Sequence, residues 1–187
     1  MGARINSFTT PMQGLIRLEL QPVNDVRGSF TRLFCQDDLS DFLNGRMIAQ
    51  INHAHSIHAG CVRGLHYQNP PYAEIKIVKC IRGKIFDVAV DLRAGSTTFL
   101  KWFGLELAGH DHTMLLIPEG FAHGYQALEP DSEIIYLNTM AYTPASEGAV
   151  HYADPAIDIQ WPLPVRDLSE RDATHPFLTS QFSGLNL

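Results

Sequence analysis

Residues 74–92 read EIKIVKCIRGKIFDVAVDL, and this stretch decides the fold class. Two apolar runs rich in β-branched residues, at 74–81 and 85–92, stand on either side of the turn signal Arg-Gly-Lys. Short apolar runs bounded by a glycine-containing turn are typical of β-strands. The stretch therefore predicts two strands joined by a tight turn.

Comparable strand patterns lie on both sides of this stretch, at residues 15–20, 101–108, 113–118 and 132–140. Helical patterns are short and cover only residues 36–43 and 168–173. In the second, Ser169 is a predicted N-cap three residues before Asp172. Many strands, glycine and proline punctuation and little helix predict an all-β chain, either a closed barrel or a double-sheet jelly roll with a few short peripheral helices.

The 187 residues are enough for one sizeable domain. We expect a single domain over residues 1–187, with N-terminal strands in 1–50, a barrel core in 51–142 and a C-terminal wrapping segment in 143–187. The segment from Asp154 onward is rich in proline, which central strands do not accommodate. It is therefore expected to run in an extended form over the barrel.

Composition excludes several classes of protein. The net charge of -6 argues against general nucleic-acid binding, which needs a basic face. No apolar run approaches the roughly 20 residues of a membrane span, and the first ten residues lack the apolar centre of a signal peptide. Three cysteines without metal-type spacing predict reduced thiols and a cytoplasmic location.

The stretch CVRGLHYQ, residues 61–68, holds a first group of chemically active side chains. Arg63 is suited to clamping phosphates, and His66 is a proton acceptor near neutral pH. Strict alternation would place these two side chains on opposite faces of a strand, but a bulge at Gly64 would turn both inward. Lys76, on the next strand, is suited to stabilising an oxyanion. From this stretch alone, a structural role is equally well supported, with Arg63 as a surface residue and His66 as a hydrogen-bonded core residue.

A second motif, IPEGFAHGYQ at 117–126, places His123 after a Pro-x-Gly turn. The pattern P-x-G-x-x-H resembles the second sequence block of cupin jelly rolls. The first cupin block has two histidines, of which the chain keeps His66 and replaces the other by Gln68. Glutamine is a poor ligand for transition metals, so we expect no metal rather than a site made of His66, His123 and Glu74.

Three further features have a functional and a structural interpretation each. Tyr136 lies in an apolar strand, where it is either a core residue or a proton donor that faces His66. The HAHSIH tract at 53–58 is expected to be a loop or the start of a strand rather than a metal site. In NDVRGSF, residues 24–30, the guanidinium of Arg27 and the ring of Phe30 could meet a nucleotide, although a surface hairpin is the default.

Five stretches taken together resemble the dTDP-4-dehydrorhamnose 3,5-epimerase family. They occur in the family order from about residue 14 to residue 178, and they are RGLHYQ, KIVKCIRGKIFDVAVDLRAGS, IPEGFAHGY, DIQWPL and LSERDA. The resemblance implies a cupin jelly roll (a double-stranded β-helix barrel) that forms a homodimer. It also implies an isomerase of deoxysugar and polysaccharide biosynthesis, without metal or cofactor, that acts on a nucleotide-diphospho-4-keto-6-deoxyhexose.

The resemblance also assigns roles to residues of this chain. The catalytic set that it implies is His66 as base, Asp172 as its carboxylate partner, Lys76 near the oxygen at carbon 4, and Tyr136 as proton donor. The substrate-binding set that it implies is Arg63, Arg27, Phe30, Gln50, Asn52, Gln68, His123 and Tyr142. Of these, the two arginines would contact the diphosphate and Phe30 the base.

The chain also departs from the family pattern. Leu137 stands where a lysine commonly follows the tyrosine, and Ser29 and Arg32 stand at positions that are commonly aromatic and acidic. These departures leave the nucleotide open among dTDP, CDP and GDP, and they leave open whether carbon 3, carbon 5 or both are inverted. A metal-dependent cupin and a sugar-binding cupin without catalysis are the rival classes.

Overall fold

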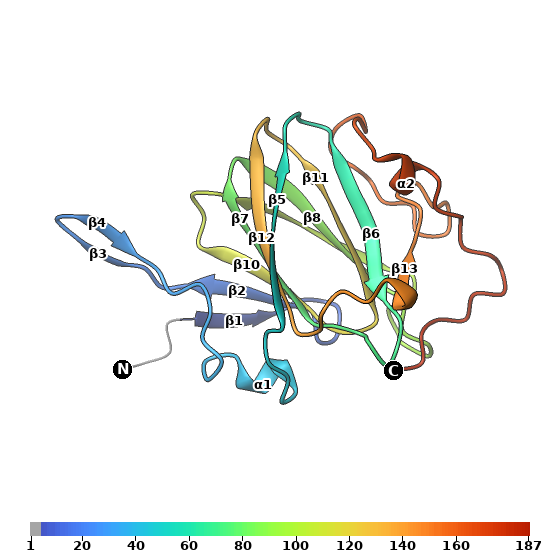
Figure 1. Cartoon of the computed structure of the whole chain (residues 1–187), viewed down its shortest axis with the longest axis horizontal. Helices are drawn as coiled ribbons and strands as arrows, with labels where there is room; N and C mark the ends of the chain where they lie inside the picture. Colours follow the sequence, from blue (N-terminus) through green and yellow to red (C-terminus); the bar gives the residue numbers. More distant parts are fainter. Residues whose placement is uncertain (1–4) are drawn as a thin grey trace.

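The computed structural model describes residues 5–187, so the first four residues of the expected domain lie outside the described part. Within residues 5–187, most strands belong to two antiparallel sheets that lie against each other (Figure 1). In spatial order the larger sheet contains β1 (Ile5–Thr9), β2 (Ile16–Leu20), β10 (Thr113–Ile117), β7 (Lys76–Arg82), β12 (Ser132–Asn138) and β5 (Gln50–Ser56). The smaller sheet contains β13 (Glu147–Ala149), β6 (Val62–Gln68), β11 (Phe121–Ala127), β8 (Lys84–Asp91) and β9 (Trp102–Ala108).

This arrangement confirms the predicted all-β jelly roll and the strands expected on each side of the central stretch. The turn between β7 and β8 does not form a hairpin, because β7 pairs with β10 and β12 while β8 pairs with β11 and β9. Gly83, with φ +67°, makes the corner that passes the chain from one sheet to the other. The sequence pattern is the same for a hairpin turn and for a corner between two sheets, and the strands with which β7 and β8 pair decide between the two.

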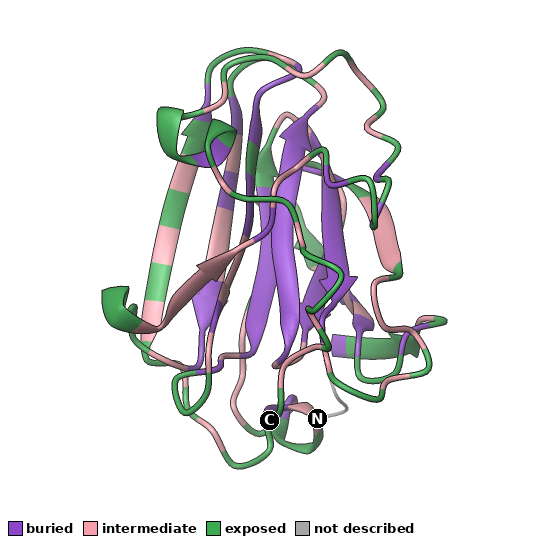
Figure 2. Ribbon diagram, turned by 90° about the vertical axis from the view of Figure 1, so that its right-hand side faces the viewer, coloured by how far each residue is buried: buried purple, intermediate pink, exposed green. Residues whose placement is uncertain are grey.

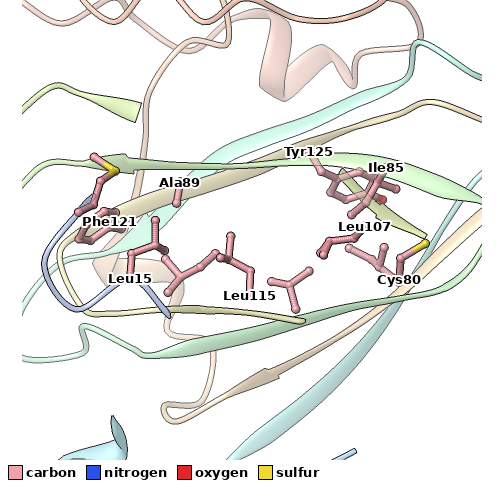
Figure 3. Packing of buried hydrophobic residues seen from close by; sticks show 12 residues of the cluster. Leu15, Cys80, Ile85, Ala89, Leu107, Leu115, Phe121 and Tyr125 are labelled. Carbon is pink, nitrogen blue, oxygen red and sulfur yellow. The ribbon is translucent and has the colours of Figure 1, made fainter. Parts of the chain in front are cut away.

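Apolar side chains fill three layers rather than one. The middle layer lies between the sheets and includes Leu15, Cys80, Ile85 and Leu115 (Figure 3). A second layer covers the outer face of the larger sheet, where Leu39 and other side chains near α1 (Ser40–Leu43) pack. The third covers the outer face of the smaller sheet. Because both faces of the central strands are covered, these strands are buried along most of their length (Figure 2).

The C-terminal part of the chain packs over the outer face of the smaller sheet (Figure 1). Ile157 and Ile159 are buried there against Val88 and Val90 of β8. Full burial of such a side chain is worth about 1.5–3 kcal/mol. The wrapping segment is therefore part of the core, and it carries α2 (Glu170–Ala173) to the top of the barrel (Figure 1).

The short helices agree with the sequence in position and partly in length. Ser169 caps α2, and its hydroxyl accepts a hydrogen bond from the backbone N–H of Asp172 at 3.0 Å, as predicted. The helix expected over 36–43 is shorter and begins only at Ser40, and the residue before it, Leu39, provides no side-chain cap. A one-turn 3-10 helix, η1 (Pro144–Ser146), precedes β13. Among residues 5–187, no helix has the length and apolar character needed to cross a lipid bilayer.

A hairpin of β3 (Val23–Asp25) and β4 (Gly28–Phe30) extends away from both sheets (Figure 1). All six of its strand residues are exposed to solvent. A two-stranded hairpin on its own is at best marginally stable in water. The exposed apolar residues of this hairpin do not pack against the core of this chain.

Asp91, at the end of β8, organises the connection to β9. Its buried carboxylate accepts from the guanidinium of Arg93 at 2.7 Å and from the hydroxyls of Ser96 and Thr98 at 2.6 Å each. Burial alone would raise the pKa of Asp91, but these hydrogen bonds outweigh burial and lower the pKa from 3.8 to about 2.

We expect Asp91→Asn to lower the free energy of unfolding by about 2 kcal/mol at pH 7, the stabilisation that the lowered pKa represents. The folded-state pKa lies below the unfolded one, so this stabilisation is complete well above pH 4. It is lost as the pH falls through about 2, and the difference between variant and wild type should shrink accordingly. Urea unfolding at several pH values measures it. The exposed Asp41→Asn is the control, with a change within about 0.5 kcal/mol, and an equal cost for both variants would contradict the role of Asp91.

Candidate active site

A cavity of about 820 Å³ lies between the two sheets and extends along β5 and β6. Strands β5, β7 and β12 of the larger sheet line one wall, and β6 and β11 of the smaller sheet line the other. The segment around α2 closes the rim. A cavity of this size, with a few convergent polar groups, is typical of a small-molecule site.

A bulge in β6 brings Arg63 and His66 to this cavity together. His66 pairs with His123 of β11 and Arg63 with Tyr125, so β6 advances three residues where β11 advances two. Gly64, with φ +119°, lies at the bulge. This confirms the predicted bulge, because Arg63 and His66 both line the cavity although simple alternation would separate them.

His66 and Asp172 form a hydrogen-bonded pair. The His66 Nε2 and Asp172 Oδ1 atoms are 2.7 Å apart, and Asp172 Oδ2 accepts from the backbone N–H of Gly64 at 3.2 Å. Burial would raise the pKa of Asp172, but the hydrogen bond from His66, the charge of His66 and the Gly64 N–H together lower it. An ionised Asp172 holds the ring proton of His66 on Nε2 and leaves the Nδ1 lone pair for proton transfer.

Tyr136 lies on the opposite sheet, in β12, and lines the same cavity. Its ring also packs against the middle core layer, so both sequence interpretations describe part of its environment. Burial raises the pKa of its hydroxyl, which is therefore protonated at neutral pH. Among residues 5–187, no side chain or backbone group is hydrogen-bonded to that hydroxyl. The group is free to act on a molecule in the cavity.

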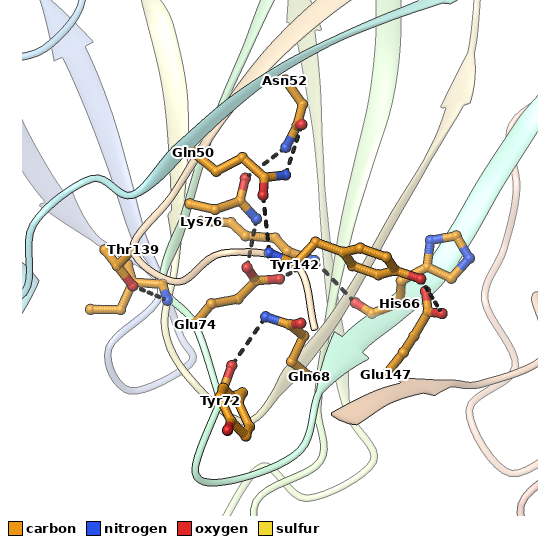
Figure 4. Close-up of polar contacts among 12 residues, drawn as sticks. Gln50, Asn52, His66, Gln68, Tyr72, Glu74, Lys76, Thr139, Tyr142 and Glu147 are labelled. Carbon is orange, nitrogen blue, oxygen red and sulfur yellow. Dashed lines mark hydrogen bonds and ion pairs between the residues drawn. The ribbon is translucent and has the colours of Figure 1, made fainter. Parts of the chain in front are cut away.

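Lys76 lies at the floor of the cavity on β7. Its Nζ is 3.1 Å from Glu74 Oε1 and donates to the backbone carbonyl of His66 at 3.4 Å (Figure 4). Glu74 in turn accepts from the amide of Asn138 at 2.7 Å. The sequence reading considered Glu74 only as a possible metal ligand, and the structure shows it as the residue that anchors the lysine.

His123 belongs to a second histidine–carboxylate pair. Its Nε2 is 2.7 Å from Asp87 Oδ1, and both side chains are buried beside the cavity. The sequence reading missed Asp87. The signal was available, because an acidic residue inside the apolar strand IFDVAVDL is costly to bury without a partner.

The polar rim of the cavity contains the other expected binding residues of the barrel. The side-chain amide of Gln50 makes two hydrogen bonds (Figure 4). Its Nε2 donates to Asn52 Oδ1 at 2.8 Å, and its Oε1 accepts from the backbone N–H of Tyr142 at 3.0 Å. Gln68 accepts from the backbone N–H of Thr143 at 2.6 Å. These contacts order the segment after β12 over the cavity mouth.

Arg27 and Phe30 do not line the cavity of their own chain. Both lie on the projecting β3–β4 hairpin, where Arg27 pairs with Asp25 at 2.6 Å and the ring of Phe30 is 64% exposed. The predicted surface hairpin is confirmed.

The histidine tract at 53–58 lies mainly within β5, which corrects the expectation of a loop or the start of a strand. Alternation explains the difference, because exposed and half-buried residues alternate along β5 as in a regular edge strand. His53 and His55 share a face, as predicted, and pair with Glu133 and Asp131.

A cluster with metal-type donors includes a residue that the sequence reading missed. His66, Asp172 and His175 each offer one ligand atom, and the three atoms lie within 4.8 Å of one another. His175 follows Asp172 by three residues, which is the spacing of one helical turn. The three-residue spacing in SERDATHP, residues 169–176, was the feature of the sequence that could have indicated that His175 lies near Asp172.

Comparison with known proteins identifies the relatives of this chain. The family model for dTDP-4-dehydrorhamnose 3,5-epimerase matches residues 9–180. A dTDP-4-dehydrorhamnose 3,5-epimerase of Shigella flexneri is 37% identical over 90% of this chain and 93% of its own length.

Two solved structures are also similar. A dTDP-6-deoxy-D-glucose-3,5-epimerase of Legionella pneumophila, in complex with dTDP-4-keto-L-rhamnose, has a TM-score of 0.89 and 34% identity, covering 98% of this chain and 99% of that one. A 3'-monoepimerase of Streptomyces bikiniensis, in complex with dTDP-quinovose, has a TM-score of 0.81 and 32% identity, covering 90% of this chain and 85% of that one. With sequence, fold and cavity in agreement, the chain belongs to the dTDP-4-dehydrorhamnose 3,5-epimerase family.

Proposed function

We propose that the protein is an epimerase that inverts carbons 3 and 5 of a dTDP-linked 4-keto-6-deoxyhexose. The observation that carries this proposal is the position of two proton-transfer groups, His66 with Asp172 and Tyr136, on opposite walls of one cavity. The relatives described above are named for dTDP-sugars or bind them, which supports dTDP as the nucleotide.

The chemistry follows from the positions of these groups. A C–H bond next to a ketone loses its proton when the enolate is stabilised, and the Nδ1 lone pair of His66 accepts that proton. The electron pair moves to the oxygen at carbon 4, where the ammonium of Lys76 stabilises the negative charge. Tyr136 then donates a proton to the other face of the same carbon, which inverts the centre. A histidine alone would exchange the proton without inversion.

The residues within reach also explain how the reactive groups are held. Asp172 fixes the tautomer of His66, and Glu74 fixes the position of Lys76. Arg63 lines the cavity, and its Nη2 donates to the backbone carbonyl of His55 at 2.8 Å, which holds the guanidinium at a wall where a diphosphate could be bound.

We also propose that the protein works as a homodimer in which each β3–β4 hairpin reaches the cavity of the partner subunit. The hairpin exposes Val23, Val26 and Phe30, and it has no core of its own chain to cover them. A second copy would cover these residues and would bring Arg27 and Phe30 to a bound nucleotide. We propose a cytoplasmic location as well, where Cys35, Cys61 and Cys80, which are free thiols, stay reduced.

Solvent exchange tests the proposed reaction. Incubation with dTDP-4-keto-6-deoxyglucose in heavy water should incorporate two deuterons with inversion at both centres, measured by mass spectrometry and NMR. One deuteron would identify a single-centre epimerase, as in the Streptomyces bikiniensis relative. CDP- and GDP-linked sugars in parallel test the nucleotide. Binding without any incorporation would favour a sugar-binding module, and exchange that requires an added metal would favour a metal-dependent cupin.

Removal of His66 and removal of Tyr136 should have different effects on deuterium exchange and on inversion. His66→Ala should lower exchange by at least about 10²-fold, because a general base contributes roughly 10²–10⁴-fold. Tyr136→Phe should keep part of the exchange and lose inversion, because proton removal remains while proton delivery to the other face is lost. Full epimerisation by Tyr136→Phe would remove the role given to this residue.

Removal of the hairpin guanidinium should weaken substrate binding. Arg27→Ala should raise KM by roughly 10- to 100-fold with little change in kcat, because one charged hydrogen-bonding group on a phosphate is worth about 1.5–3 kcal/mol. Arg82→Ala, an exposed arginine at the end of β7, is the control. Sedimentation should give a dimer for both. A fully active monomer would contradict the shared site.

A further inference from the structure

His175 stands beside the proposed base although the reaction requires nothing from it. The rings of His66 and His175 meet edge to face, with centroids 5.7 Å apart. The Nε2 atom of His175 is 3.4 Å from the Oδ1 atom of Asp172, the same oxygen that His66 approaches at 2.7 Å. One carboxylate oxygen therefore faces two imidazoles.

The Nε2 atom of His175 is buried and makes no hydrogen bond with any residue in the range 5–187. The side chain as a whole is only 14% exposed. Buried polar side-chain atoms nearly always have a hydrogen-bond partner, whereas this nitrogen has an ion-pair contact with Asp172 at 3.4 Å in place of one, and an ion between them could supply the missing partner. The nitrogen faces the other two donors of the cluster rather than solvent.

The three donors are close enough for one small cation. Their ligand atoms lie within 4.8 Å of one another. Zinc binds histidine nitrogen and carboxylate oxygen at about 2.0–2.2 Å, so two ligands of one ion lie roughly 3–4 Å apart. Two histidines and one carboxylate are a donor set that zinc enzymes use, with the remaining position open to water or substrate.

We propose that a zinc ion binds between His66, Asp172 and His175 and that this binding stops the enzyme. The inhibitory part of this inference rests on the proposed function, whereas the metal site does not. His175 is the residue that creates the site, because without it only two ligands face the ion.

Inhibition follows from the tautomer of His66. In the metal-free protein the ring proton lies on Nε2 and is donated to Asp172, which leaves a lone pair on Nδ1. A neutral imidazole has one free lone pair and one N–H. When zinc takes the lone pair of Nε2, the proton must lie on Nδ1, and that nitrogen can no longer accept a proton from the sugar.

Zinc titration of the metal-free full-length protein tests the site without any substrate. Calorimetry should show a bound zinc ion that His175→Gln weakens by at least about tenfold, since even outer-shell partners of a metal are worth 10- to 100-fold. Cobalt should show the visible absorption of a low-coordinate site in wild type and not in the variant. His53→Gln, which removes an exposed histidine paired with Glu133, is the matched control and should bind like wild type. His175→Asn serves if the glutamine variant does not fold.

Deuterium exchange then tests inhibition. At a free zinc concentration of ten times Kd, exchange by wild type and by His53→Gln should fall about tenfold, while exchange by His175→Gln should stay nearly unchanged. Equal zinc affinity in wild type and His175→Gln, or a rise of exchange with zinc, would overturn the proposal. Zinc binding that depends on His175 in a protein without exchange on any sugar would leave the metal site in place and count against the proposed function.

Discussion

The close approach of β6 to β11 at Gly64 is the constraint on which the site depends. A Cβ atom on Gly64 would lie 2.6 Å from the Cα of Gly124, and a Cβ on Gly124 would lie 2.6 Å from the carbonyl oxygen of Arg63. The two glycines thus let β6 and β11 approach each other at the bulge, where a pair of residues with Cβ atoms would clash. The bulge turns Arg63 and His66 to one cavity and aims the Gly64 N–H at Asp172. Binding, proton removal and control of the base therefore share one backbone distortion.

The C-terminal segment links stability with catalysis. It covers the outer face of the smaller sheet, where the indole of Trp161 donates to the carbonyl of Tyr152 at 3.0 Å. The same segment then places Asp172 on β6 through a one-turn helix capped by Ser169. Such a short helix is not stable by itself. The position of the Asp172 carboxylate is therefore held by core packing on the outer face of the smaller sheet.

Much of the fold was readable from the sequence because its signals are local. Strand periodicity, the N-cap at Ser169 and the glycine bulge are each written in a few neighbouring residues. Pairings across the chain were not readable: nothing in IFDVAVDL says that Asp87 meets His123, and nothing near Glu74 says that it anchors Lys76. The HAHSIH tract was misjudged because its partners, Glu133 and Asp131, lie nearly 80 residues away on β12 and in the turn before it. The hairpin that carries Arg27 and Phe30 was readable from the sequence, but its position apart from both sheets and from the cavity was not.

Asp172 shows why proton chemistry and metal chemistry compete at this site. The carboxylate makes His66 a base by holding the proton on Nε2, and the same negative charge attracts a cation to that nitrogen. In a site with one histidine the competition is weak, because two ligands hold zinc poorly. A second imidazole, His175, packs edge to face against His66 and lies 3.4 Å from Asp172 Oδ1, so it adds a third donor to the pair. The ionised carboxylate that orients His66 as a base is thus also what attracts a metal to the pair once a third donor is near.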